Sequence, residues 1–484
     1  MIHLHKLSFL LCLPLLALRA EAYNSRDQSF QNPFCIIGAG PSGLTVAHYL
    51  EAQGKTTAIF DSNAEVGGKC QAYYDDSIAR TTYHAMGALI FTNESYSNTL
   101  PLILQAGLPL SPALSPGPSA DWNYWQYSSG EQGAQNITKL PTPDTLDMVL
   151  IAAEVEKYTL LWENTFGTLY SGPRYEGDIP EELTVPMNQW LSDNLFLAIP
   201  TFVEFGLVYE GYGDITQTPA LYALQFLTPE ILTYYIGTTP GYFVDFHKLW
   251  VWYAQNYVKG TIYSNTNVIK IDRSGDYPII TYKTSGNDFS TTQACSSLIM
   301  AFPPTPRALN AAGLDFTDQE SDLFSNVGVT AYWSAAFEMN LPYPYAFLET
   351  PASPDFRPVV MLRYFNESTI STAYSLGPSP YNASSAASDE QVKQLLVSSA
   401  NNLAKGLVQN GFTGVQEADI DVKLLTRHDY FPRVSSEALQ AGFYTKYNAL
   451  QGQKNTFWTS GLDRFENVES AIRAAKDLVD NVMV

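Results

Sequence analysis

The sequence predicts an α/β fold built on a parallel sheet. The first observation is an apolar run at residues 34–37, which is followed by a glycine-rich turn, a helical pattern and a second apolar run. The second is that short apolar runs of the same kind recur near residues 297 and 456. The third is length, because 484 residues with 45% hydrophobic content suffice for two or three domains.

The glycine-rich turn has the spacing Gly-x-Gly-x-x-Gly, which suits the pyrophosphate of a dinucleotide. It connects the predicted strand at residues 34–37 to a helix predicted over residues 42–53. A second strand, over residues 56–60, ends in Asp61, whose carboxylate is placed to bind a ribose hydroxyl. This order predicts a Rossmann-type dinucleotide-binding domain. Its candidate cofactor-binding residues are Gly38, Gly40, Pro41, Ser42, Gly43 and Asp61.

A second glycine pair narrows the choice of dinucleotide. Gly67, Gly68 and Lys69 end the segment 63–69, directly beyond the second strand. This segment resembles the glycine pair of the FAD-dependent, amine-oxidase-like flavoproteins, which lies along the FAD pyrophosphate and ribityl chain. Lys69 stands where that family more often has arginine, so the charge is kept while bidentate hydrogen bonding is lost. The resemblance implies FAD, and an ordinary glycine turn is the alternative.

Two distant segments also resemble this family. Residues 267–283 predict a hairpin that leads to a buried strand at residues 297–304, and the resemblance places Val268 at the adenine side. Residues 456–461 predict a strand that ends at Gly461.

A helix follows that strand, with Asn467 as its N-cap and Val468 as its first residue. In the family, this helix directs its amides and positive dipole at the flavin pyrimidine oxygen. Leu462 departs from the family, which commonly has an acidic residue at this place.

The resemblance implies an amine-oxidase or glutathione-reductase-like architecture in which two domains are interleaved. The FAD-binding domain is expected to contain residues 23–90, 256–310 and 451–484, and an α+β substrate domain residues 91–255 and 311–450. Within the substrate domain, the patterns predict a helix over 147–162, strands over 327–337 and 359–365, and a helix whose capping box is Ser388 and Gln391.

The first 22 residues have the features of a secretory signal peptide: a basic residue, a short apolar run and a small-x-small cleavage pattern. The apolar run is too short for a transmembrane anchor, so we expect a secreted or lumenal protein of the secretory pathway. Four Asn-x-Ser/Thr sequons suggest a glycoprotein, at Asn93, Asn136, Asn366 and Asn382.

Three cysteines remain after the predicted cleavage: Cys35, Cys70 and Cys295. They allow at most one disulfide. Cys35 lies within a predicted buried strand and is expected to be a free thiol, whereas a Cys70–Cys295 pair stays open. No Cys or His pair has metal-ligand spacing, so no metal site is predicted. Because no cysteine follows Cys295, the thioether attachment of the family's covalent members is not available, and the flavin is expected to be noncovalent.

The net charge of −21 excludes nucleic acid as a partner, since an acidic chain repels phosphate backbones. A flavin accepts a hydride from an activated C–H bond. We therefore expect an oxidase or dehydrogenase that acts on an apolar or aromatic small molecule, with O2 as candidate electron acceptor. The resemblance to the flavoprotein family implies that this molecule is a secondary-metabolite intermediate. A flavin-dependent double-bond isomerase of lipids and a non-catalytic flavin-binding protein are the alternatives.

His84 and His428 are the candidate catalytic residues. His84 follows the glycine pair and leads into the substrate domain, and His428 lies in an aromatic segment at residues 427–433. Histidine is suited to acid-base or orienting roles near neutral pH. A buried histidine with a purely structural role is the alternative for His84.

Overall fold

The computed structural model describes residues 32–77, 82–113, 123–128, 137–140, 144–378, 387–415 and 420–483. The predicted signal peptide and the sequons at Asn136 and Asn382 fall outside these ranges, so they stay predictions.

Five strands from distant parts of the chain form one parallel sheet, in the order β10-β2-β1-β14-β20. Ile36 lies between Ile59 and Ile299 in the register of the three central strands. This sheet confirms the predicted α/β fold class, and its strands β14 and β20 come from two of the segments that resemble the flavoprotein family. The bounds are β1 Phe34–Ile37, β2 Thr57–Phe60, β10 Thr261–Tyr263, β14 Ser297–Met300 and β20 Thr456–Trp458.

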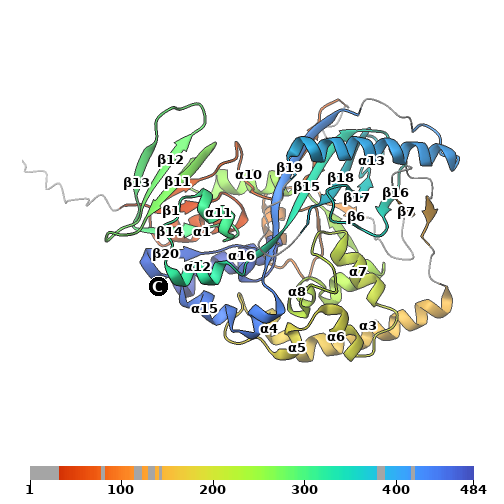
Figure 1. Ribbon diagram of the computed structural model, residues 1–484, viewed down its shortest axis with the longest axis horizontal. Helices are drawn as coiled ribbons and strands as arrows, with labels where there is room; N and C mark the ends of the chain where they lie inside the picture. Colours follow the sequence, from red (N-terminus) through yellow and green to blue (C-terminus); the bar gives the residue numbers. More distant parts are fainter. Residues whose placement is uncertain are drawn as a thin grey trace, which may run out of the picture. The chain divides into compact units, whose positions relative to one another are not determined.

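Successive side chains of a strand point to opposite faces of this sheet, and apolar residues cover both faces. Ile36, Ile59 and Ile299 pack against three helices, whereas Ile37, Phe60 and Met300 belong to the core on the opposite face. The helices are α1 (Pro41–Ala52), α10 (Phe246–Tyr257) and α16 (Val468–Asp477). The opposite face lies under the antiparallel sheet β11 (Thr266–Asp272), β12 (Ile279–Thr284) and β13 (Thr291–Ala294), which contains the predicted hairpin (Figure 1).

A second large sheet has seven strands in the order β19-β15-β18-β17-β16-β7-β8. Helix α13 (Asp389–Gln409) runs along its outer face, and the predicted capping box of Ser388 and Gln391 begins that helix (Figure 1). The strands predicted over 327–337 and 359–365 are β15 and β17. The bounds are β7 Asn123–Tyr127, β8 Thr138–Lys139, β15 Gly328–Glu338, β16 Tyr345–Glu349, β17 Pro358–Leu362, β18 Ile370–Leu376 and β19 Val422–Arg433.

A layer of helices lies below the inner face of that sheet (Figure 1). The helix predicted over 147–162 is part of α3, which Asp144 and Asp147 begin with a capping box. The layer contains α3 Thr145–Thr165, α4 Gly167–Ser171, α5 Glu181–Thr184, α6 Met187–Asp193, α7 Pro200–Val208, α8 Ala220–Phe226 and α9 Pro229–Tyr235.

Short elements connect these layers. Strands β3 and β4 pair with each other, and β9 lies between β5 and β6 in a small sheet. Their bounds are β3 Ala72–Asp75, β4 Thr82–Ala85, β5 Ile90–Phe91, β6 Ser111–Ala113, β9 Gly241–Phe243, α2 Thr99–Gln105, α11 Pro306–Ala311, α12 Asp318–Phe324, α14 Ser436–Gln440 and α15 Phe443–Ala449. The boundaries predicted for the two domains stay predictions.

The cysteine pairing differs from the expectation. Cys35 forms a disulfide with Cys295, and the two Cα atoms are 5.5 Å apart, while Cys70 is a buried free thiol. The prediction of a free Cys35 was wrong because β1 and β14 are neighbours in the sheet, which brings Cys295 beside the start of β1. Nothing local in the sequence shows this pairing, since the two cysteines are 260 residues apart.

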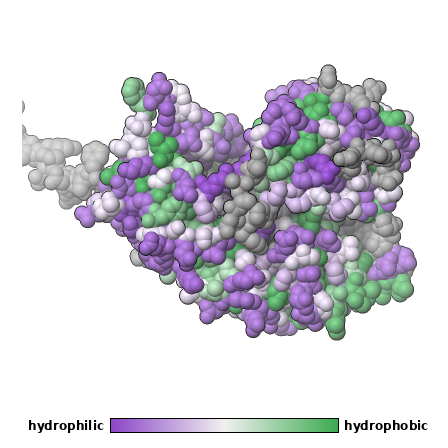
Figure 2. All heavy atoms as spheres, viewed as in Figure 1, coloured by the Kyte–Doolittle hydropathy of each residue, from purple (hydrophilic) through white to green (hydrophobic). Residues whose placement is uncertain are grey.

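The surface seen in Figure 2 is largely hydrophilic, in keeping with the acidic composition. Hydrophobic side chains gather at the lower right of that view, where α3 lies; Leu146, Val149 and Leu160 are exposed on this helix. A search of the described residues for a helix long and apolar enough to span a bilayer finds none.

Candidate active site

One cavity of about 910 Å³ has two connected parts. The first part, which we call the cleft, lies at the ends of β1 and β2 and is lined by residues that include Gly38, Asp61 and Gly68. The second part, which we call the chamber, lies between the helical layer and the inner face of the seven-stranded sheet. Its lining residues include Tyr124, Phe205, Tyr235, Tyr332, Leu348 and Tyr374.

The predicted glycine motif forms the first wall of the cleft. Gly38 has a φ of +111°, and a Cβ atom there would lie 2.7 Å from the carbonyl oxygen of Ala301. A Cβ atom on Gly43 would lie 2.0 Å from the carbonyl oxygen of Gly38, so Gly43 allows the close packing of α1. Gly40 is the N-cap of α1 and provides no side chain to cap it, which leaves the first amides of the helix open to an anion.

The second glycine pair lies directly against this motif. A Cβ atom on Gly68 would be 2.9 Å from Cα of Gly40, and the amide of Gly67 donates a hydrogen bond to the carbonyl oxygen of Ala39 at 2.9 Å. Gly67 and Gly68 both have positive φ values, +115° and +55°. The two loops therefore make one continuous backbone surface, which approaches a ligand without side chains in between.

Asp61 closes the end of the cleft at β2. Its Oδ2 accepts the amide of Ala39 at 2.5 Å, and its Oδ1 accepts the amide of Asn63 at 2.7 Å. Burial raises the pKa of Asp61, while these two amides act in the opposite direction. Each carboxylate oxygen has a further lone pair, so the side chain can hold the loop and also accept a ribose hydroxyl. Thr266 and Val268 of β11 also line the cavity, and the adenine-side role of Val268 stays a prediction.

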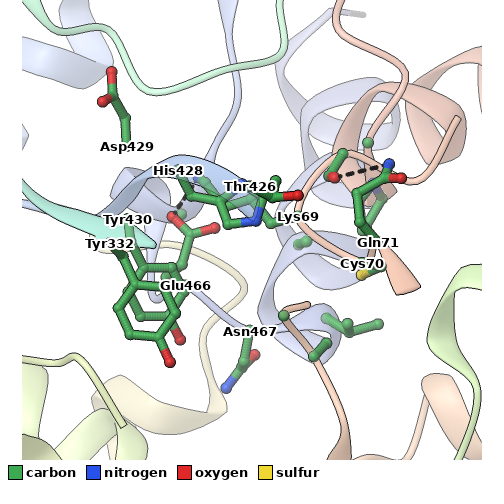
Figure 3. A pocket seen from close by; sticks show the side chains of 18 of the residues that line it. Lys69, Cys70, Gln71, Tyr332, Thr426, His428, Asp429, Tyr430, Glu466 and Asn467 are labelled. Carbon is green, nitrogen blue, oxygen red and sulfur yellow. Dashed lines mark hydrogen bonds and ion pairs between the residues drawn. The ribbon is translucent and has the colours of Figure 1, made fainter. Parts of the chain in front are cut away.

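Lys69 and Glu466 form an ion pair where the cleft meets the chamber, with 3.0 Å between Nζ and Oε2 (Figure 3). Gly461 makes room for Glu466, because a Cβ atom on Gly461 would lie 2.8 Å from the same carboxylate oxygen. Sequence reasoning missed Glu466. Its only signal was its place directly before the predicted N-cap of α16.

The predicted cap of α16 is confirmed. The Asn467 side chain accepts the amide of Ser470 at 2.7 Å, and Val468 is the first helical residue. Asn467, Val468 and Gly461 all line the cavity, so the positive end of the helix dipole lies at the cleft.

The two candidate histidines have different places. His428, on β19, lines the cavity (Figure 3). Its Nε2 lies 3.1 Å from the carbonyl oxygen of Met86. Burial and then the charge of Lys69 lower the pKa of His428 to about 4, so at neutral pH it is an uncharged ring that donates from Nε2. The neutral His428 ring can therefore orient a neighbouring group through a hydrogen bond, but it does not provide a positive charge at neutral pH.

His84 is fully buried and is not among the residues that line the cavity. Its Nε2 lies 3.2 Å from the hydroxyl of Ser368, which in turn donates to Asp75 at 2.7 Å. Burial lowers the pKa of His84 to about 4, against the effect of Asp75. This geometry fits the structural alternative, in which His84 joins β4 to the segment before β18.

Tyrosines dominate the chamber. Tyr212, Tyr430, Tyr332 and Tyr374 form a row of stacked rings, with successive centroids 5.4, 5.0 and 5.8 Å apart and successive planes inclined by 27 to 30°. Figure 3 shows Tyr332 and Tyr430 stacked beside Glu466. The sequence showed the abundance of tyrosine, but the row depends on the pairing of β15 with β18 and β19.

The cleft fits a flavin dinucleotide on three observations. Its glycines leave a backbone surface on which side chains would clash, and two helix N-termini, of α1 and α16, point into one cavity. Asp61 lies at the end of β2, the place of the ribose-binding acid in this kind of sheet. Together with the adjoining chamber, the fold and site have the arrangement that the resemblance to amine-oxidase-like flavoproteins predicts: an FAD cleft that opens onto a substrate chamber.

Comparisons with known proteins agree with a flavin-dependent enzyme. Residues 36–104 match the model of the NAD(P)-binding Rossmann-like domain. The FAD-dependent oxidoreductase dpchF of Colletotrichum higginsianum is 26% identical over 487 residues, with 94% of each chain covered. Beta-cyclopiazonate dehydrogenase of Aspergillus flavus is 23% identical over 434 residues, covering 88% of this chain and 87% of that protein.

Among solved structures, the CLA-producing fatty acid isomerase from P. acnes has a TM-score of 0.73 at 21% identity, and covers 94% of this chain and 99% of its own. Putrescine oxidase has a TM-score of 0.63 at 14% identity, with the same coverage. These comparisons confirm the predicted superfamily and the predicted fold class. Beta-cyclopiazonate dehydrogenase, to which we expected a resemblance, is among the similar proteins. Oxidoreductase and FAD, the predicted enzyme class and cofactor, are also the terms in the relatives' names.

Proposed function

We propose that this protein is an FAD-dependent oxidoreductase that removes a hydride from an apolar or aromatic small molecule, a secondary-metabolite intermediate, with or without ring closure. The observation that carries the proposal is the continuity of the cleft with the tyrosine-rich chamber. A dinucleotide in the cleft and an apolar substrate in the chamber would meet near Lys69 and Glu466. Relatives over nearly the whole chain are named FAD-dependent oxidoreductases.

FAD supplies a ring that accepts a hydride. The protein's own residues hold and orient the reactants. The open amides of α1 would bind the pyrophosphate, Asp61 would bind the ribose, and the N-terminus of α16 would favour negative charge on the flavin pyrimidine. In the chamber, burial raises the pKa of Tyr212, Tyr332 and Tyr430, so these rings stay neutral, exclude water and stack on an apolar substrate.

The cellular setting is part of the proposal. The disulfide between Cys35 and Cys295 is of the kind that persists in oxidising compartments, which supports the secretory pathway. Asn93 and Asn366 are exposed, as glycosylated asparagines must be. O2 is the proposed electron acceptor.

The first experiment is the visible absorption spectrum of the purified protein, followed by acid precipitation. We expect flavin bands and a released chromophore that chromatographs as FAD, because the cleft fits a noncovalent dinucleotide. A colourless protein that takes up no FAD on incubation contradicts the proposal. Anaerobic mixing with aromatic candidate substrates should then bleach the flavin, and failure of every substrate to do so would favour a non-catalytic flavin-binding protein.

A double-bond isomerase is the second candidate function, because the chamber also has aliphatic walls, with Leu348, Val360 and Leu362 among its lining residues. Such walls suit a lipid chain. The two functions differ in their electron balance: oxidation consumes one acceptor per product, whereas isomerisation returns the hydride and consumes none. Measuring O2 uptake against product formation separates them.

A further inference from the structure

Glu210 is a carboxyl group inside the aromatic chamber. It lies on the turn that follows α7, and it lines the cavity. Gly211, the next residue, has a φ of +83°, and a Cβ atom there would lie 2.7 Å from the ring of Tyr332. The turn is therefore packed tightly against the row of tyrosines, which fixes where the Glu210 side chain enters the chamber.

The partners of Glu210 do not neutralise it. Its Oε1 accepts the hydroxyl of Tyr235 at 3.2 Å, and no lysine, arginine or histidine among the described residues pairs with it. The groups that face it are tyrosines of several elements: Tyr124 of β7, Tyr234 and Tyr235 of α9, Tyr332 of β15, Tyr374 of β18, and Tyr212. Tyr96 and Tyr364 face it as well. Burial raises the pKa of each of these tyrosines, so all stay neutral between pH 6 and pH 8.

The cations that line the cavity form ion pairs with carboxylates other than Glu210. Lys69 binds Glu466, and Arg307 and Arg427 share Asp429. A substrate carboxylate placed beside Glu210 would therefore meet an anion that has no cation among the described residues as a partner, whereas a hydrogen-bond donor would find an acceptor. Charge-assisted hydrogen bonds are about twice as strong as neutral ones, and a buried acceptor strengthens them further.

We propose that Glu210 is a substrate-binding residue that accepts a hydrogen bond from a hydroxyl or amide N–H group of an otherwise apolar substrate, and that it excludes carboxylates. The inference rests on the proposed function and narrows its substrate class. It also separates the two candidate functions, because a free fatty acid has the excluded group while an alcohol or amide has the accepted one.

Burial raises the pKa of Glu210 to about 7, with the Tyr235 hydrogen bond acting in the opposite direction. The side chain is then ionised at about pH 8 and largely protonated at about pH 6. Selection against carboxylates should be strongest at the higher pH, since a protonated Glu210 can itself donate a hydrogen bond to a carboxylate.

The test uses two matched ligands, 4-phenyl-1-butanol and 4-phenylbutyrate, with the FAD-loaded protein in a calorimeter. At about pH 8 we expect the alcohol to bind roughly tenfold or more tightly than the carboxylate, as a charge-assisted hydrogen bond would give. The preference should shrink at about pH 6. In Glu210→Gln the carboxylate should bind better than in the wild type, and the preference should no longer depend on pH.

Glu204→Gln is the matched control, because Glu204 is an exposed carboxylate on the neighbouring α7. It should keep the wild-type preference and its pH dependence. Tyr235→Phe is a second variant: it removes the hydrogen bond that favours the ionised form, so the change in preference should move to higher pH. A preference that is unaltered in Glu210→Gln, or the binding of neither ligand by the wild type, overturns the inference.

Flavin content and anaerobic flavin reduction are measured on the same samples, and these readouts test the proposed function separately. A protein that holds FAD and is reduced by a substrate, yet prefers the carboxylate, refutes the role of Glu210 alone. A protein without flavin that selects the alcohol through Glu210 refutes the proposed function alone.

Discussion

The residues of this site are of two kinds. Some must be a particular amino acid because of the local backbone geometry, and others have a role only through the side chains that the fold places beside them. Gly38, Gly43 and Gly68 must be glycine because their Cβ atoms would lie closer than 3.0 Å to other backbone atoms. Because glycine is required at fixed positions, the sequence shows a regular glycine spacing from which these residues could be predicted. Glu210 and Glu466 have no such spacing, since their roles depend on which chain segments lie opposite them.

Gly68→Ala should lose most of its bound flavin, because the added Cβ would lie 2.9 Å from Cα of Gly40 and push the two loops of the cleft apart. Gly54→Ala is the control. Gly54 also has a positive φ, +79°, but no atom lies within 4 Å of its added Cβ. Each change costs about 1 kcal/mol of backbone strain, so that cost cancels in the comparison. The ratio of flavin to protein absorbance measures the result, and equal flavin content in the two variants would contradict the assignment of the cleft.

Glu210→Gln should be more stable than the wild type at about pH 8, and the two should converge toward about pH 4. The pKa of Glu210 is raised from 4.5 to about 7, so between these values the folded state holds a proton that the unfolded state has lost. Wild-type stability therefore falls as pH rises through this window, by ~3 kcal/mol at about 1.4 kcal/mol per pKa unit. Thermal unfolding of the FAD-loaded proteins across pH measures the difference. A difference that does not vary with pH would show that Glu210 titrates normally.

Among the elements, α7 shows how a buried acid positions a wall of the chamber. Glu154 of α3 accepts the amides of Leu197, Ala198 and Ile199 at 2.7 to 3.0 Å, directly before α7 begins. The turn into α7 thus satisfies its amides with a side chain from another helix. The helix then carries Phe205 to the chamber and ends beside Glu210.

Glu154→Ala should destabilise the protein by about 3 kcal/mol, since it leaves three buried or half-buried amides without an acceptor. Glu156→Ala, at an exposed position on the same helix, should change stability little. Chemical unfolding followed by fluorescence gives the two values. We also expect weaker binding of 4-phenyl-1-butanol in Glu154→Ala only, because α7 would move. Equal stability of the two variants would show that the cap contributes nothing.

At the scale of the whole molecule, the sequence predicted the cofactor half better than the substrate half. The β1-turn-α1-β2 unit is contiguous, so its spacing and periodicity are local signals. The seven-stranded sheet instead joins β7 to β16 across more than two hundred residues, and the chamber exists only on its inner face. Of its stacked tyrosines, only Tyr332 comes from a predicted strand, β15, whereas Tyr374 and Tyr430 lie on strands that the sequence did not predict. No local pattern shows that the three stack in a row.

The disulfide is the covalent counterpart of that long-range assembly, because it links Cys35 of β1 to Cys295, which lies two residues before β14. It closes a loop of 260 residues, which includes the glycine motif, the helical layer and the hairpin of β11 and β12. Cys295→Ser should therefore lower the free energy of unfolding by about 2 to 5 kcal/mol, mainly by freeing the unfolded chain. Reductant should lower the melting temperature of the wild type but not of this variant. Cys70→Ser, which alters the buried free thiol, should keep the wild-type response to reductant. If reductant leaves the wild type unchanged while the disulfide is shown to be broken, the link is dispensable for stability, and the structural argument for an oxidising compartment is lost.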